Sequence, residues 1–261
     1  MTKIENQLQK IKESKKIGLM THVIVGYPTV SETKKIVKIM AETGVDFVEL
    51  QIPFSDPLAD GPTIMQACEK SLENGTKVKD AFTLMTELSQ EVEIPLLFMA
   101  YYNTVFRYGV EKFCEEAAIA GASGLIVPDM PIDEEDQEHF YEYCKKYNLH
   151  VIHVVSPAST DNRLRKNADL ATGFVYATAR QGTTGVKGQL DDSVTEYLHK
   201  LQTYFSIPVA VGFGISSKTQ IDMLTGHVDI AVLGSALINV INNSEQDEVE
   251  KNVKSFLEGL R

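Results

Sequence analysis

Two carboxylate residues, Glu49 and Asp60, are the strongest candidates for chemistry in this sequence. Glu49 lies in a largely apolar run, Asp46–Ile52, that is typical of a β-strand. Because side chains alternate across a strand, we expect Glu49 to share one face with Phe47 and Gln51, opposite an all-aliphatic face. A carboxylate that is partly removed from water can both donate and accept a proton. The pattern therefore predicts acid–base chemistry at the end of this strand.

Each carboxylate also has a structural interpretation. A buried Glu49 could serve only as one partner of an ion pair, which is the usual fate of buried carboxylates. Asp60 directly precedes Gly61, a position typical of a helix N-cap or turn aspartate. The proline-rich chain between the two residues could equally return Asp60 over the end of the strand. The residues alone leave both interpretations open.

The rest of the chain alternates short apolar runs with helical segments, as in a parallel sheet built from βα units. Several of these runs are apolar almost throughout, which is typical of strands buried on both faces. The eight predicted strands are Leu19–Val25, Asp46–Ile52, Pro95–Ala100, Gly124–Val127, His150–Val154, Gly173–Tyr176, Pro208–Val211 and Asp229–Leu233. Eight units favour a closed (β/α)8 TIM barrel over an open doubly wound sheet.

Three helices carry recognisable signals. Glu32–Glu42 has apolar residues at helical spacing, and Asp133–Lys146 begins with acidic residues and ends with lysines, which complements the helix dipole. An extra N-terminal helix is predicted from Ile4, Leu8 and Ile11, which fall on one side. We expect this helix to cover the floor of the barrel.

Composition fits one TIM-barrel domain over residues 1–261, with 43% hydrophobic residues. The net charge of −11 disfavours nucleic acid and anionic membranes as partners. Cys68, Cys114 and Cys144 are widely spaced, so neither a disulfide framework nor a metal site is expected. No apolar run reaches about 20 residues and the N-terminus has no apolar targeting region, so we expect a cytoplasmic protein.

Glycine-rich turns follow the last two predicted strands. These turns are Gly212-Phe213-Gly214 and Gly234-Ser235, and the second can open a short helix at Ala236–Val240. Backbone N–H groups at such positions bind phosphate without a large positive patch, although a glycine pair after a strand is also an ordinary turn. The loop Ala179–Gly188 contains three glycines and is predicted to act as a lid that orders on ligand binding.

The segment from Glu49 to Ile64, in which PFSDPLADGP begins four residues after Glu49, resembles the signature of the tryptophan synthase α family. The similarity covers nearly the whole chain. Other similar segments are Met99–Asn103, Gly124–Asp129, Gly173–Tyr176, Thr184-Gly185, Gly212–Ser216 and Gly234–Ala236.

This resemblance implies a lyase that cleaves indole-3-glycerol phosphate to indole and glyceraldehyde 3-phosphate by a retro-aldol reaction in tryptophan biosynthesis. Glu49 would transfer the proton at indole C3, and Asp60 would accept a hydrogen bond from the indole N–H. Tyr176, at the end of the sixth strand, would support Glu49 or simply fill the core. The remaining substrate-binding residues implied are Tyr101, Thr184, Gly185, Gly212, Gly214, Gly234 and Ser235, with Thr184 contacting Asp60 in a closed state.

The resemblance also implies a partner, the tryptophan synthase β subunit, in an α2β2 assembly. Pyridoxal phosphate would belong to that partner, and no cofactor or metal is expected in this chain. The residues that match the family's partner-facing surface are Pro53, Asp56, Pro57, Asn103, Phe106, Asp129 and Pro131.

Two positions depart from the common family pattern. Gln51 stands where glycine is usual and could hydrogen-bond Glu49. His22 replaces a residue that is often aromatic or apolar. We interpret His22 as a satisfied core histidine rather than a second proton carrier.

Besides the partner-dependent lyase, a free-standing lyase that releases indole and a catalytically weak regulatory subunit remain open. A phosphate-binding isomerase barrel is a more distant alternative, and the segment from Glu49 to Pro62 argues against it.

Overall fold

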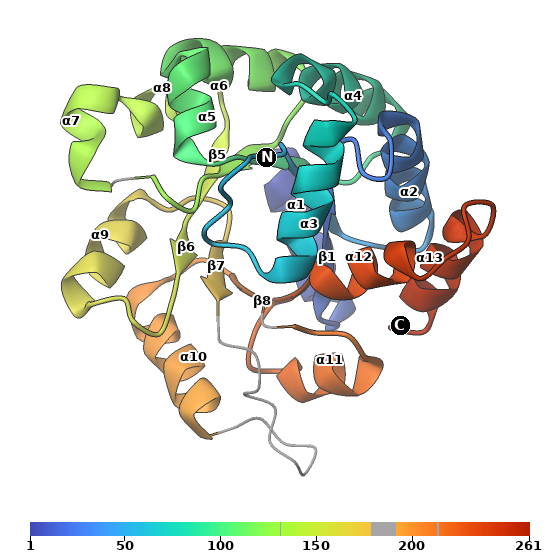
Figure 1. The fold of residues 1–261 in the computed structure, drawn as a ribbon. Helices are drawn as coiled ribbons and strands as arrows, with labels where there is room; N and C mark the ends of the chain where they lie inside the picture. The colour runs from blue at the N-terminus through green and yellow to red at the C-terminus, as the bar shows by residue number, and fades with distance from the viewer. Residues whose placement is uncertain (131, 179–191, 213) are drawn as a thin grey trace.

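The strands of the protein form one parallel sheet that curls into a barrel (Figure 1). The computed structural model describes residues 1–130, 132–178, 192–212 and 214–261. The strands are β1 (Gly18–Ile24), β2 (Phe47–Gln51), β3 (Leu96–Met99), β4 (Gly124–Ile126), β5 (His150–Ile152), β6 (Val154–Val155), β7 (Val175–Thr178), β8 (Val209–Gly212) and β9 (Ile230–Leu233). Their order is β5-β4-β3-β2-β1-β9-β8-β7-β6. The predicted (β/α)8 TIM barrel with an extra N-terminal helix is confirmed.

The fifth predicted strand is divided at His153. Its first half, β5, pairs with β4, and its second half, β6, pairs with β7. The carbonyl of His153 accepts a hydrogen bond from the N–H of Tyr176 at 2.9 Å, so the strand changes neighbours at this residue. The prediction of one unbroken strand is therefore wrong at this point, and the ring closes through the chain itself.

Helices surround the strands (Figure 1). They are α1 (Lys3–Ser14), α2 (Val30–Glu42), α3 (Pro62–Glu73), α4 (Val78–Glu91), α5 (Tyr102–Tyr108), α6 (Val110–Ile119), the 3-10 helix Ile132–Glu134, α7 (Glu135–Glu138), α8 (Phe140–Lys146), α9 (Asp161–Leu170), α10 (Asp192–Tyr204), α11 (Lys218–Leu224), α12 (Ser235–Asn242) and α13 (Val249–Glu258). The core accordingly has an outer layer between helices and strands and a smaller layer inside the ring.

The N-terminal helix covers the floor of the barrel, as predicted. Ile4 and Ile11 of α1 are 0% and 8% exposed and belong to the core inside the ring, with Leu8 packed beside them. A capping box between Thr2 and Glu5 satisfies the first N–H groups of the helix. The helix therefore seals the end of the barrel at which the strands begin.

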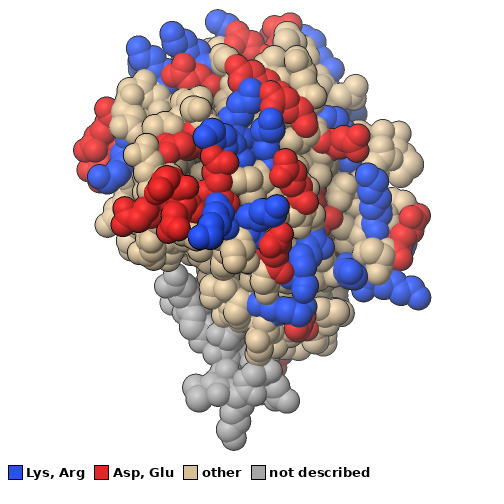
Figure 2. Space-filling view, turned by 90° about the vertical axis from the view of Figure 1, so that its right-hand side faces the viewer, with Lys and Arg blue, Asp and Glu red and all other residues tan. Residues whose placement is uncertain are grey.

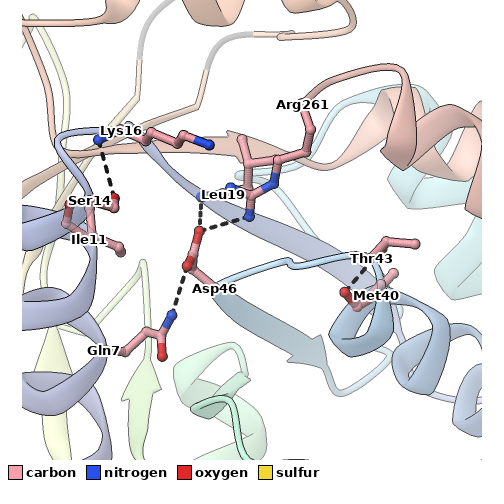
Figure 3. A network of polar contacts seen from close by, with 9 residues as sticks. All are labelled: Gln7, Ile11, Ser14, Lys16, Leu19, Met40, Thr43, Asp46 and Arg261. Carbon is pink, nitrogen blue, oxygen red and sulfur yellow. Dashed lines mark hydrogen bonds and ion pairs between the residues drawn. The ribbon is translucent and has the colours of Figure 1, made fainter.

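Asp46, which directly precedes β2, links three parts of this floor (Figure 3). Its Oδ1 accepts a hydrogen bond from Gln7 of α1 at 2.7 Å. Its Oδ2 accepts one from the N–H of Leu19 at 2.8 Å and one from the guanidinium of Arg261 at 3.2 Å. Both carboxylate oxygens are thus used to hold α1, β1 and the C-terminal residue together.

The predicted helix Asp133–Lys146 is broken at His139, which corrects the sequence-based expectation. His139 has a positive φ of 53°, and a new helix, α8, starts after it. The carboxylate of Glu135 accepts hydrogen bonds from the N–H groups of Tyr141 and Glu142, both at 3.0 Å. A side chain of one helix thereby caps the next, which charge patterning along the sequence does not reveal.

Charges of both signs are mixed on the face that Figure 2 shows. Ion pairs join α2 to its neighbours: Lys34 pairs with Glu87 and Glu91 of α4, and Lys35 pairs with Glu250 of α13. The net charge of −11 is therefore not gathered into a single acidic patch on this face. Along the described part of the chain, none of the helices combines the length and apolarity needed to cross a membrane.

Candidate active site

β2 points Glu49 into the barrel, as strand alternation predicts. Glu49 is 2% exposed and Gln51 is fully buried, and Phe47 on the same face belongs to the core inside the ring. Val48 and Leu50 pack instead in the outer core against the helices. The carboxylate of Glu49 thus lies inside the ring towards the carboxyl end of its strand, where barrel enzymes hold their active sites.

His22 on β1 lies directly beside Glu49. The parallel register of β1 and β2 makes the two residues partners, and Nδ1 of His22 is 3.1 Å from Oε2 of Glu49. Burial disfavours the charged form of His22, but the negative charges of Glu49 and Asp60 outweigh it and raise the pKa of His22. The site therefore holds a histidine–glutamate pair that the sequence analysis missed, because the register between strands is not visible in a sequence.

The loop after β2 returns Asp60 over the mouth of the barrel. Oδ2 of Asp60 accepts a hydrogen bond from Nε2 of Gln51 at 2.8 Å and another from the hydroxyl of Tyr101 at 3.0 Å. The N–H of Ala59 donates to the same hydroxyl at 2.9 Å. Gly61 is the N-cap of α3, so Asp60 does not cap that helix. The interpretation that returns Asp60 over the mouth is confirmed.

Gln51 has a different partner from the expected one. Its amide donates to Asp60 and lies 3.5 Å from Sγ of Cys68, whereas no hydrogen bond joins it to Glu49. The expectation that Gln51 would hydrogen-bond Glu49 is wrong, because the returning loop offers a carboxylate closer to its amide. Gln51 therefore orients Asp60 rather than Glu49.

Among the described residues, two buried polar atoms of this mouth have no hydrogen-bond partner, Nε2 of His22 and Oε1 of Gln51. Oε2 of Glu49 lies 3.1 Å from Nδ1 of His22. Each unpaired atom costs about 1–3 kcal/mol when it is buried, so folded proteins rarely keep several together. His22 is consequently not the satisfied core histidine that the sequence suggested. The concentration of unpaired groups indicates a site that is completed by a polar ligand.

Tyr176 lies in the same mouth, from β7. Burial is the main cause that raises the pKa of Tyr176 well above its ordinary value, and the negative charges of Glu49 and Asp60 add to it. A Cβ atom at Gly212, on the neighbouring strand β8, would lie 2.5 Å from the Tyr176 hydroxyl. The phenol is therefore neutral, and its position requires glycine at residue 212.

The glycine turns after β8 and β9 lie at the same end, because these two strands are neighbours and parallel. Gly214 has a φ of 75°, in the left-handed region. Gly234 is the N-cap of α12, which starts at Ser235 and has no side-chain cap, so its first N–H groups are not used by a capping side chain. The arrangement fits the predicted phosphate site. Thr184 and Gly185 lie outside the described residues.

The residues expected to face a partner lie around the same mouth, but they differ in exposure. Asp56, Asn103 and Asp129 are exposed and Phe106 is 54% exposed. Pro53 and Pro57 are buried, and Pro131 lies outside the described residues. Leu58, in the loop after β2, is 91% exposed and was missed by the sequence reading, although an apolar residue between Pro57 and Asp60 could have indicated a contact.

A cleft of about 690 Å³ lies at the opposite end of the barrel, beside α1. Lys12, Lys16 and Asp229 are among the residues that line it. It contains neither Glu49 nor Asp60, so its volume does not make it the catalytic site.

The sequence matches the family model described as tryptophan synthase alpha chain over residues 8–260. The chain belongs to the tryptophan synthase α chain family. The match includes both carboxylates of the mouth, His22 and the glycine turns after β8 and β9.

Individual relatives agree with this membership along their whole length. The tryptophan synthase alpha chain of Desulfotalea psychrophila is 42% identical, with 99% of each chain covered. That of Caldanaerobacter subterraneus is 36% identical, covering 100% of this chain and 99% of the relative. The structure of the alpha subunit from Legionella pneumophila superposes with a TM-score of 0.91 at 27% identity, covering 100% of this chain and 97% of the other. These family matches do not favour the free-standing lyase or the regulatory subunit.

Proposed function

We propose that this chain cleaves indole-3-glycerol phosphate to indole and glyceraldehyde 3-phosphate, with Glu49 as the proton-transferring group and Asp60 as the group that binds the indole N–H. The observation that carries the proposal is the pair of carboxylates at the mouth of the barrel. One is buried beside His22, and the other is held in place by two hydrogen bonds.

Glu49 serves at two points of the retro-aldol reaction. As a carboxylic acid it protonates C3 of the indole ring, and as the resulting carboxylate it accepts the proton of the C3′ hydroxyl while the C3–C3′ bond breaks. The electron pair of that bond returns to the ring, which restores indole, and the aldehyde forms at C3′. One proton enters and one leaves, so Glu49 ends in the form in which it started.

Asp60 stabilises the positive charge that develops on the indole ring after protonation at C3. Gln51 and Tyr101 both donate to its Oδ2, and neither hydrogen bond involves Oδ1, which therefore suits a donor from the substrate. A fixed carboxylate close to a developing positive charge is worth several kcal/mol in a site that excludes water. The two donors position Asp60 before the substrate arrives.

The phosphate of the substrate binds at Gly212, Gly214, Gly234 and Ser235, with Thr184 and Gly185 completing the site. Backbone N–H groups and the positive end of the α12 dipole attract the dianion. This mode of binding explains how a chain of net charge −11 recognises an anion locally.

We further propose that the product indole passes to a tryptophan synthase β subunit in an α2β2 assembly, and that pyridoxal phosphate belongs to that partner. This chain is similar to a solved structure of the tryptophan synthase complex from Pyrococcus furiosus, with a TM-score of 0.84 and 30% identity. The similarity covers 93% of this chain and 97% of the other. Phe106 and Leu58 offer exposed apolar surface beside the mouth, and Asp56, Asn103 and Asp129 lie in the same region.

The test is an indole-release assay with and without a β subunit, comparing the parent with Glu49→Gln. Glu49→Gln is expected to lower kcat by about 10²–10⁴-fold in both settings, because removal of a general acid–base group costs that much. Glu42→Gln, an exposed change at the end of α2, is the matched control and should leave the rate unchanged. A rate that survives Glu49→Gln would refute the proposed mechanism.

A further inference from the structure

His22 stands in an unusual place for a strand histidine. It is 5% exposed, it points into the ring from β1, and its Nδ1 lies 3.1 Å from Oε2 of Glu49. Its Nε2 has no hydrogen-bond partner. Among the described residues, the imidazole thus has one nitrogen against the proton-transferring carboxylate and the other without a hydrogen bond.

The groups around His22 are of one charge. Glu49 faces it from β2 and Asp60 from the loop after β2. Tyr176, in the same mouth, is neutral, because burial raises the pKa of its phenol. On the other side Gly234 contributes no side chain, and an ideal Cβ there would lie 3.6 Å from the Cβ of His22. Among the described residues, none that acts on His22 carries a positive charge that would oppose a proton on the imidazole.

His153 provides an internal comparison, because it is another buried histidine of the barrel wall. Its Nδ1 is 2.7 Å from Oδ1 of Asn167, its ring stacks on Tyr141, and its Nε2 also lacks a partner. Burial lowers the pKa of His153, whereas the carboxylates raise the pKa of His22 despite its burial. The two histidines differ in the charge of their neighbours rather than in depth.

We propose that His22 is a positioning residue for the proton transfer: its imidazolium holds the carboxylate of Glu49 towards the substrate and sets the pH range in which Glu49 works. This inference rests on the function proposed for Glu49. A positive charge at 3.1 Å favours the ionised form of Glu49, so Glu49 gives its proton to indole C3 more readily than it could alone. A neutral side chain at residue 22 removes that effect while leaving Glu49 in place.

The first experiment is the pH–rate profile of indole release for the parent, His22→Asn and His153→Asn. Asparagine keeps a hydrogen-bond donor near Glu49 but carries no charge. In His22→Asn we expect the basic limb of the kcat profile to move upwards by about one pH unit, because a nearby charge shifts titration by roughly that amount. Without that charge the carboxylic acid that protonates indole C3 persists to higher pH. His153→Asn controls for loss of a buried histidine and should not move the profile. Superimposable profiles for the parent and His22→Asn would overturn the proposal.

A second measurement does not depend on activity. In the folded protein labelled with ¹⁵N-histidine, the His22 resonances should titrate above the ordinary value of about 6.5, and Glu49→Gln should lower the titration midpoint. A midpoint that is the same in both proteins would contradict the pairing. The outcomes also separate the two proposals. Full activity of Glu49→Gln would refute the proposed function. An inactive Glu49→Gln with an unchanged titration midpoint of His22 would refute only the role of His22.

Discussion

Asp46 directly precedes β2 and Glu49 lies three positions later, within the strand, and their carboxylates have different surroundings. Asp46, at the floor, has three hydrogen-bond donors on its two oxygens (Figure 3). Glu49, inside the ring, instead has Nδ1 of the buried His22 at 3.1 Å from its Oε2. The floor uses its carboxylates for structure, and the mouth keeps its own available for a ligand.

A second aspartate at the floor of the barrel makes the same kind of hydrogen bond. Asp229 directly precedes β9, and its Oδ2 accepts a hydrogen bond from the N–H of Val209 at 2.8 Å, just as Asp46 accepts one from Leu19. In both cases an aspartate before one strand satisfies a backbone N–H of the neighbouring strand. The comparison teaches that an acid whose oxygens hold backbone N–H groups is structural, whereas a fully buried acid beside a histidine and other unpaired polar atoms is a candidate for catalysis.

After Glu49→Gln, the largest expected effect comes from Asp60→Asn, which removes charge from the mouth without changing size. We expect kcat/KM for indole release to fall by about 10²–10³-fold, as for other groups that stabilise charge in a transition state. The free energy of unfolding should change little. Asp222→Asn, on the exposed surface of α11, is the control. Equal rates for Asp60→Asn and the parent would remove Asp60 from the mechanism.

Asp46→Ala tests the floor. The change removes three hydrogen bonds and leaves the N–H of Leu19 without its partner, so we expect the free energy of unfolding to fall by about 2–3 kcal/mol. Denaturant unfolding measures the loss. The kcat of the folded variant should stay within about twofold of that of the parent, because the floor does not contact the substrate. A large loss of kcat would show that the floor and the mouth of the barrel do not act independently.

Gly212→Ala crowds the mouth from β8. The added Cβ would meet the Tyr176 hydroxyl at 2.5 Å, so the ring must move away from the site. We expect about a tenfold lower kcat/KM, corresponding to about 1.4 kcal/mol. Tyr176→Phe removes the hydroxyl in question, so adding it to Gly212→Ala should recover part of the loss. If kcat/KM does not recover in the double variant, contact with the Tyr176 hydroxyl is not the cause of the loss.

Tyr101→Phe is expected to have the smallest effect. It removes one of the two donors to Asp60 but leaves Gln51 in place. One hydrogen bond to a charged group is worth about 1.5–3 kcal/mol when lost outright, and the remaining donor should limit the fall in kcat/KM to about tenfold or less. Steady-state kinetics checks this; a fall as large as that of Asp60→Asn would mean that Tyr101 does more than hold Asp60.

The inward direction of Glu49 could be predicted because alternation along a strand is a local property. The position of Asp60 could be anticipated only as one of two options, since prolines restrict a loop without fixing where it ends. The partner of Gln51 was predicted wrongly, because strand alternation says nothing about a loop that returns from outside the strand. The pairing of His22 with Glu49 depends on the register between β1 and β2, and the break at His139 depends on capping by Glu135. These are contacts between segments, which no local pattern contains.

The divided strand at His153 has a consequence for how the barrel opens. β1 and β2 are paired over five residue pairs, whereas β6 is paired with β7 over two. Amide hydrogens of residues 150–155 should therefore exchange with solvent through smaller local openings than those of β1 and β2. In the strand order of the sheet, β5 and β6 stand at the two ends and β1 stands in the middle. We therefore expect local opening between β5 and β6 to leave the His22 and Glu49 pair in place.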